Sequence, residues 1–255
     1  MGVPMLPLSE QGLRCVAFDK WGHGRSDRVG HGFDYDTLAD DLAALLDHLD
    51  LREVTLAAHS MGGGEVIRYL SRHGYDRVSR IVLIAATAPL AMRTPDNPEG
   101  VDRAVFDAIM ADRTKDRPRW TAQNAQAFFA THLGNQVSTE LIERTIQRCL
   151  DCSAKAAVEV VRTGFRTDLR EECAAVQLPT LIIHGDADAS APIDLCGRRL
   201  AKPVPGNVYK ECPGAAHAIF MTHAEQVNRD LLDFIGDGSS SHTPAVSAEV
   251  AGEEP

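Results

Sequence analysis

Five short runs of apolar residues along the chain each end at a polar or glycine-rich turn, which is the pattern of buried β-strands. Stretches with the helical spacing of apolar residues separate most of these runs. Because parallel strands need crossover connections, this alternation predicts an α/β fold whose mostly parallel sheet has about five strands covered by helices. The expected strands are Leu13–Phe18, Val54–Ala58, Ile81–Ala85, Thr180–His184 and Val208–Cys212.

Helix signals lie between the expected strands. Asp34 offers a side-chain cap, and leucines then recur three and four positions apart from Leu38 to Leu49 along one helical face. Further helices are expected at 65–72, directly after the second strand, and at 223–235, near the end of the chain.

The stretch from Pro89 to Pro179 is too long for a simple crossover and has helical periodicity with few strand signals. Long connections in compact domains are usually lids, and open α/β sheets bind ligands at the carboxyl ends of their strands. We therefore expect a helical cap at about 89–179 inside one domain at 1–235, the alternative being a helical excursion that only packs. The tail 236–255 has no Lys or Arg and almost no large apolar residue, so we expect disorder there.

The charge balance excludes several kinds of partner. Lys and Arg number 26 against 36 Asp and Glu, a net charge of −10, which opposes binding to nucleic acid or to anionic lipid. No apolar run approaches the ~20 residues that span a bilayer, and the first residues do not have the form of an export signal. We expect a cytoplasmic protein that acts on a small molecule, without a nucleic-acid or membrane partner.

Two motifs suggest a metal or a nucleotide only weakly. The six cysteines are scattered, and the single C-x-x-C, at Cys149 and Cys152, lacks the second pair or neighbouring His that a zinc site needs. The turn from Gly22 to Asp27 begins like a dinucleotide-binding fingerprint but lacks its third glycine and is followed by a loop. No metal and no cofactor are expected.

The strongest chemical signal is Ala58-His-Ser-Met-Gly62, placed between an expected strand and an expected helix. Hydrolases expose a nucleophilic serine on a sharp turn that needs small residues on both sides. Ser60 occupies that place, although the first small residue is Ala58 where glycine is usual. The alternative is a serine in an ordinary loop between a strand and a helix.

A base and an acid follow Ser60 in the order found in serine hydrolases of this architecture. The fourth expected strand runs into Asp186 and Asp188, and the fifth is followed by His217. At the carboxyl edge of the sheet these groups would converge on Ser60, with His217 as general base and Asp188 as its orienting acid. Asp186 is the rival acid. For His217 and Asp188 the alternative is a loop-capping or surface role.

Several segments together resemble the α/β-hydrolase superfamily, most closely its cofactor-free, non-haem chloroperoxidases and arylesterases. The resemblance implies hydrolysis of small carboxylic esters through an acyl-serine, with Ser60, Asp188 and His217 as the triad and no metal or haem. It also implies a side reaction in which peroxide takes the acyl group and the resulting peracid oxidises halide. The segments are Phe18–Asp27, Tyr35–Leu46, His59–Val66, His184–Asp188 and His217.

Three further residues are candidates for the site. His59, Met61 and Trp120 are expected to line the substrate pocket, and the backbone N–H of Met61 would form half of the oxyanion hole. For Trp120, simple core packing is the stronger interpretation.

The resemblance also implies strands and an H-G-x-P loop ahead of Met5, where that loop would supply the second oxyanion N–H. A donor of this kind is worth ~3 kcal/mol, so we expect reduced activity from the chain as given. An alternative function is therefore an impaired hydrolase fold that acts by binding a partner or ligand. We also expect an open slot beside Val54–Ala58, instead of direct pairing of that strand with Leu13–Phe18.

Overall fold

The computed structural model describes residues 2–236, and its centre is a four-stranded parallel sheet with the strand order β1-β2-β3-β4. Four of the five expected strands are confirmed within a few residues, and every neighbouring pair is parallel. The expected tail lies, from residue 237 on, outside the described residues. The strands are β1 (Val54–His59), β2 (Val78–Ile84), β3 (Thr180–Gly185) and β4 (Val208–Cys212).

The expected strand at Leu13–Phe18 is wrong: these residues have no regular secondary structure. Val16 is 44% exposed and Phe18 is 40% exposed, although both have strong strand propensity. A strand is held by ladder hydrogen bonds to a neighbour, and within the described residues β1 pairs with β2 alone. The sheet therefore has four described strands, not five, and no ladder joins Leu13–Phe18 to β1.

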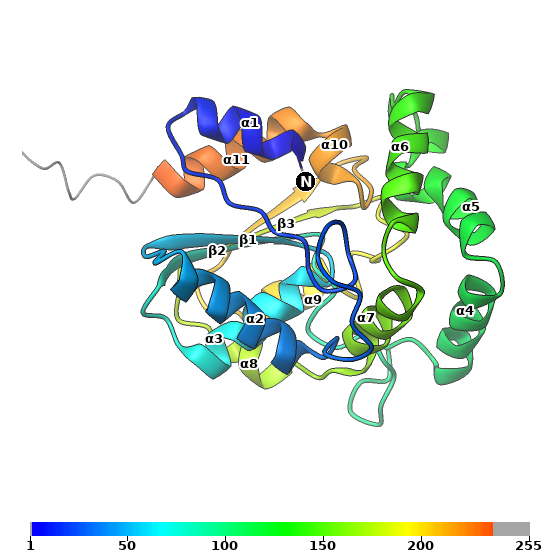
Figure 1. Ribbon diagram of the computed structural model, residues 1–255, viewed down its shortest axis with the longest axis horizontal. Coiled ribbons are helices and arrows are strands. Elements are labelled where there is room, and N and C mark those ends of the chain that lie inside the picture. Colours follow the sequence, from blue (N-terminus) through cyan, green and yellow to red (C-terminus); the bar gives the residue numbers. More distant parts are fainter. Residues whose placement is uncertain (1, 237–255) are drawn as a thin grey trace, which may run out of the picture.

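Helices cover both faces of the sheet (Figure 1). One face carries α2 (Tyr35–His48), α3 (Gly62–His73), α8 (Arg170–Ala174) and α9 (Gly197–Ala201). The other carries α1 (Gly2–Glu10), α10 (Ile219–Thr222) and α11 (Ala224–Gly236). Each face has its own apolar core, as the continuous apolar strands require.

The start of α2 confirms the cap expected from the sequence. The Asp34 carboxylate accepts a hydrogen bond from the backbone N–H of Thr37 at 2.9 Å. Leu38, Leu42 and Leu46 are buried along the face that packs on the sheet. A local cap and one apolar face are thus enough to place this helix.

A helical insertion lies between β2 and β3 and forms the green block at the right of Figure 1. Its contacts reach the loops after β1 and β4; for example, the backbone N–H of Ala218 donates to the carbonyl of Phe128 at 2.9 Å. None of the helices in the described part of the chain is long and apolar enough to cross a membrane. The insertion comprises α4 (Arg103–Lys115), α5 (Arg117–Phe129), η1 (Thr131–Leu133), α6 (Thr139–Leu150) and α7 (Ala154–Arg166).

Candidate active site

Ser60 lies on the sharp turn between β1 and α3 with a left-handed backbone, φ 57°. A non-glycine residue in this region is strained, and such strain is typical of an exposed nucleophile. The turn needs glycine behind it, because a Cβ on Gly63 would lie 2.6 Å from the Cβ of Ala86. A Cβ on Gly64 would overlap the phenol group of Tyr35. The glycines after Ser60 thus let α3 start directly at the end of β1.

The structure brings the three sequence-predicted residues into one hydrogen-bonded chain. The Oγ of Ser60 lies 2.9 Å from Nε2 of His217, and Nδ1 of the same ring lies 2.7 Å from Oδ2 of Asp188. The Asp188 side chain is fully buried and that of His217 is nearly so. Such a constellation, in which a base contacts the nucleophile and an acid orients the base, is the arrangement that activates a serine.

Asp188, and not Asp186, is the carboxylate that contacts His217. Its second oxygen, Oδ1, accepts hydrogen bonds from the backbone N–H groups of Ser190 (2.9 Å) and Ala191 (2.7 Å), which fix its orientation. Asp186 is exposed and accepts a hydrogen bond from the backbone N–H of Gly214 at 2.6 Å. Asp186, the rival acid, thus caps the loop, which is the role that sequence reasoning held open for Asp188.

His59 packs against His217, the expected general base. Its Nε2 donates to the backbone carbonyl of His217 at 2.8 Å, and its ring lies 4.6 Å from the ring of His217 and 4.8 Å from that of Phe220. Burial, followed by the charge of His217, lowers the pKa of His59 to about 3. A neutral ring therefore holds the loop that carries the base.

Met61 connects the turn to the insertion. Its carbonyl accepts a hydrogen bond from the Tyr35 hydroxyl at 3.0 Å, and its side chain packs on α7, where a Cβ added to Gly164 would lie 2.7 Å from its Cε. Trp120, on α5, lies under the guanidinium of Arg113 at 4.7 Å. The described contacts therefore link Met61, but not Trp120, to the triad.

Two contacts of the triad were not found from the sequence. The ring of Phe128, at the end of α5, lies 5.6 Å from the ring of His217. His184 is fully buried, and its Nε2 donates to the carbonyl of Ala191 at 2.8 Å, next to the carboxylate of Asp188. Phe128 stands in no recognisable motif and contacts a base that is distant in the sequence. His184 lies in the His184–Asp188 segment, but its motif does not reveal its hydrogen bond to Ala191.

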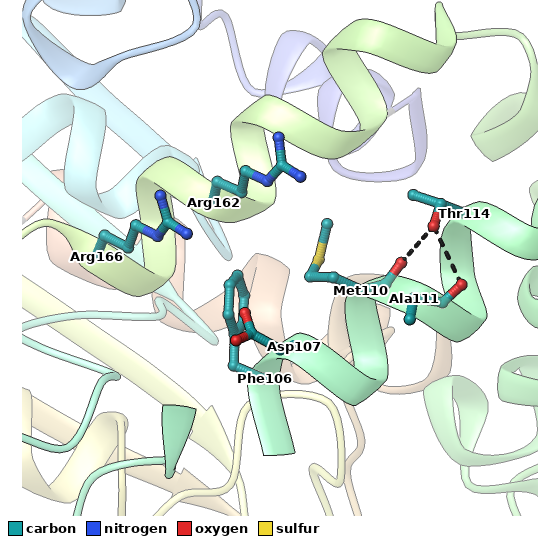
Figure 2. A pocket seen from close by; sticks show the side chains of 7 residues that line it. All are labelled: Phe106, Asp107, Met110, Ala111, Thr114, Arg162 and Arg166. Carbon is teal, nitrogen blue, oxygen red and sulfur yellow. Dashed lines mark hydrogen bonds between the residues drawn. The ribbon is translucent and has the colours of Figure 1, made fainter. Parts of the chain in front are cut away.

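A cavity of about 240 Å³ lies in the insertion between α4 and α7, away from the triad (Figure 2). Figure 2 shows the guanidinium groups of Arg162 and Arg166 on α7 opposite a mixed apolar and polar lining on α4, which includes Phe106, Met110 and the carboxylate of Asp107. Within residues 2–236, no three His, Cys, Asp or Glu side chains are grouped in a way that could hold a metal ion. The cavity is lined by Phe106, Asp107, Met110, Ala111, Thr114, Arg162 and Arg166.

Comparison with known proteins identifies the family to which this fold belongs. A family profile described as the alpha/beta hydrolase fold matches residues 4–224. A non-haem chloroperoxidase of Kitasatospora aureofaciens is 40% identical over 229 residues, covering 89% of this chain and 83% of that protein. A bifunctional esterase/perhydrolase of Acinetobacter calcoaceticus is 35% identical, covering 91% and 84%. The crystal structure of a bromoperoxidase from Bacillus anthracis superposes with a TM-score of 0.88 at 33% identity, covering 92% and 86%.

Proposed function

Because the chain belongs to the α/β-hydrolase family and is of its non-haem chloroperoxidase type, we propose that it hydrolyses small carboxylic esters through an acyl-enzyme on Ser60. The observation that carries this proposal is the continuous chain from Ser60 through His217 to Asp188, at 2.9 and 2.7 Å. These distances are those of a serine already in contact with its base.

Acylation follows from the orientation of the three groups. As the Oγ of Ser60 attacks the ester carbonyl, Nε2 of His217 accepts its proton, and the buried carboxylate of Asp188 stabilises the imidazolium and keeps the other proton on Nδ1. We assign the stabilisation of the developing oxyanion to the backbone N–H of Met61, the residue directly before α3. The imidazolium then protonates the leaving alcohol, which leaves an acyl group on Ser60.

Deacylation repeats these steps with a second nucleophile. His217 takes a proton from water, which attacks the acyl carbonyl; the bond from the acyl carbon to Oγ of Ser60 then breaks, His217 returns the proton to Oγ, and the carboxylic acid leaves. The esterase/perhydrolase relative supports a second outcome, in which hydrogen peroxide takes the place of water. The product is then a peracid, which oxidises halide after it leaves the enzyme.

The helical insertion acts as a cap in this proposal. It reaches the site at two points: the ring of Phe128 faces His217, and α7 packs on the side chain of Met61. These contacts position the base and the oxyanion donor from the side of the insertion, and they limit the size of the ester that can reach Ser60.

A binding role without catalysis is the second candidate. One observation favours it: within the described residues, the edge of β1 opposite β2 carries no strand, and an unpaired edge can accept another chain. Reactivity of the serine separates the two functions, because a binding protein does not need an activated nucleophile.

The test is labelling with a fluorophosphonate, which reacts only with an activated serine. We expect a single adduct on Ser60, found by peptide mass spectrometry, and loss of both adduct and aryl-ester hydrolysis in Ser60→Ala. Ser71→Ala, an exposed position on α3, the helix that follows Ser60, is the matched control and keeps both. Addition of peroxide during turnover should divert product to peracid, detected by bromide oxidation. Turnover that persists in Ser60→Ala would refute the acyl-enzyme.

A further inference from the structure

Cys149 and Cys152 form a thiol pair that the ester chemistry does not use. Cys149 is exposed in the last turn of α6, and Cys152 is buried in the connection between α6 and α7. The Cys152 thiol donates to the carbonyl of Cys149 at 3.3 Å, which holds the Cys152 sulfur against the last turn of α6. Residues three apart in such a turn have Cα atoms about 5 Å apart, within the range that a disulfide spans.

Positive groups surround Cys152. One guanidinium nitrogen of Arg117 donates to Sγ of Cys152 at 3.7 Å. Another nitrogen of that group donates to the carbonyls of Leu150 at 2.6 Å and of Cys152 at 3.0 Å, which fixes the guanidinium in place. Arg113 interacts with both thiols, and its buried Nε has no hydrogen-bond partner in the described part of the chain. The site is therefore built to face a negative charge.

The surroundings shift the pKa values of the two thiols in opposite directions. Burial by itself would raise the pKa of Cys152, but the hydrogen bond with His23 and the charges of His23, Arg117 and Arg113 outweigh it and lower the pKa. Partial burial of its thiol, followed by the charge of Cys152, raises the pKa of Cys149. Cys152 thus has the character of an attacking thiolate, and Cys149 that of a resolving thiol.

We propose that Cys149 and Cys152 are a peroxide-reactive pair that closes to a disulfide. The thiolate of Cys152 attacks one oxygen of hydrogen peroxide; the O–O bond breaks, hydroxide leaves and Cys152 becomes a sulfenic acid. The Cys149 sulfur then attacks the Cys152 sulfur, the S–O bond breaks, and the hydroxide leaves with the Cys149 proton as water. Two thiols and one peroxide thus give one disulfide and two waters, with two electrons passing from sulfur to oxygen.

Three other cysteines provide an internal contrast. Burial raises the pKa of Cys173 and Cys196 to about 12 and that of Cys212 to about 11, and no guanidinium donates a hydrogen bond to any of the three sulfurs in residues 2–236. Inert buried thiols of this kind stay reduced under conditions that oxidise a stabilised thiolate.

The pair lies where the insertion meets a loop of the core. The N–H of Ser153 donates to the carbonyl of Gly22 at 2.7 Å, and Arg28 donates to the carbonyl of Asp151 at 3.3 Å. His23, in the same loop, approaches Cys152 from the core side. These contacts hold the positive groups of both segments around one sulfur.

The experiment uses the full chain carrying Ser60→Ala, so that ester hydrolysis and peracid formation cannot contribute. Reduced protein is treated with a few equivalents of hydrogen peroxide, remaining thiols are alkylated after denaturation, and peptides are weighed. We expect the peptide with Cys149 and Cys152 to be lighter by two hydrogen atoms, while Cys173, Cys196 and Cys212 are alkylated. The native Ser60 chain should give the same result at the same rate, so failure of the proposed esterase leaves this test unaffected.

Single variants identify the order of the steps. Cys149→Ser should stop at a sulfenic acid on Cys152, which dimedone traps, whereas Cys152→Ser should leave Cys149 unreacted. Arg117→Gln should slow oxidation by about tenfold, with folding checked by thermal unfolding. The proposal is overturned if the buried cysteines oxidise first, if both Cys149 and Cys152 remain alkylatable, or if Cys149→Ser gives no dimedone adduct.

Discussion

Replacement of Asp188 by Asn tests the role of Oδ2, the carboxylate oxygen that contacts His217. In the native site, Oδ2 of Asp188 accepts from Nδ1 of His217, while Oδ1 accepts from the backbone N–H groups of Ser190 and Ala191. The carbonyl oxygen of Asn can keep the two backbone bonds, so its amide NH₂ must face His217. An amide NH₂ only donates, and therefore Nδ1 of His217 must lose its proton.

The ring then carries its single proton on Nε2, the atom that lies 2.9 Å from Oγ of Ser60. A protonated Nε2 cannot accept the serine proton, and the buried negative charge that stabilises the imidazolium is also gone. In a triad this combination costs a factor of about 10³–10⁴ in kcat, or roughly 4–5.5 kcal/mol of activation free energy. The fold should be little affected, because the backbone bonds of the loop persist.

Asp186→Asn is the matched control, two positions away in the same loop. Its one bond, from the N–H of Gly214, can be accepted equally by the Asn carbonyl, so we expect kcat within about threefold of the native value. The assay is the initial rate with a short aryl ester at saturation, together with thermal unfolding of both variants. A larger loss for Asp186→Asn would move the acid to that position, and equal small losses would remove Asp188 from the mechanism.

Three further outcomes are expected. The pKa of His59 is lowered to about 3 in the folded chain, so on acidification the unfolded chain binds this proton before the folded chain does. The free energy of unfolding should therefore fall as pH drops from 6.5 towards 3, by up to ~1.4 kcal/mol per pH unit. Denaturant titrations at several pH values should show that the free energy of unfolding of His59→Asn depends less steeply on pH than that of the native chain. Gly164→Ala should lower kcat by about tenfold, because the new methyl group displaces the Met61 side chain, whereas thermal unfolding should change little, since alanine favours the helix; unchanged kinetics would argue against this link between α7 and the oxyanion donor. Lys20 forms an ion pair with the buried carboxylate of Glu65, and Lys20→Met should lower the free energy of unfolding by about 3 kcal/mol at pH 8, because that charge is then unpaired. The loss should be smaller at pH 4.5, because burial raises the pKa of Glu65 and the protonated carboxyl needs no partner. Equal losses at both pH values would contradict the pairing.

The sequence by itself determined the features that depend on near neighbours along the chain. Asp34 caps α2 through a residue three positions away, and Ser60 sits on a turn followed, after Met61, by three consecutive glycines. The four confirmed strands follow from short apolar runs between helical patterns. The meeting of Ser60, Asp188 and His217 could also be predicted from the sequence, because each follows a strand and a parallel sheet brings the loops after its strands to one edge.

Tertiary structure decided whatever depends on partners distant in the chain. Leu13–Phe18 has the composition of a strand but forms none, because a strand is held by ladder bonds and, within residues 2–236, no ladder joins this segment to the free edge of β1. Asp186 and Asp188 carry the same local signal, and only burial and the position of His217 distinguish them. Contacts such as that of Phe128 with His217 exist only once the insertion has folded over the sheet, since side-chain packing, unlike helix capping, is a property of the assembled chain.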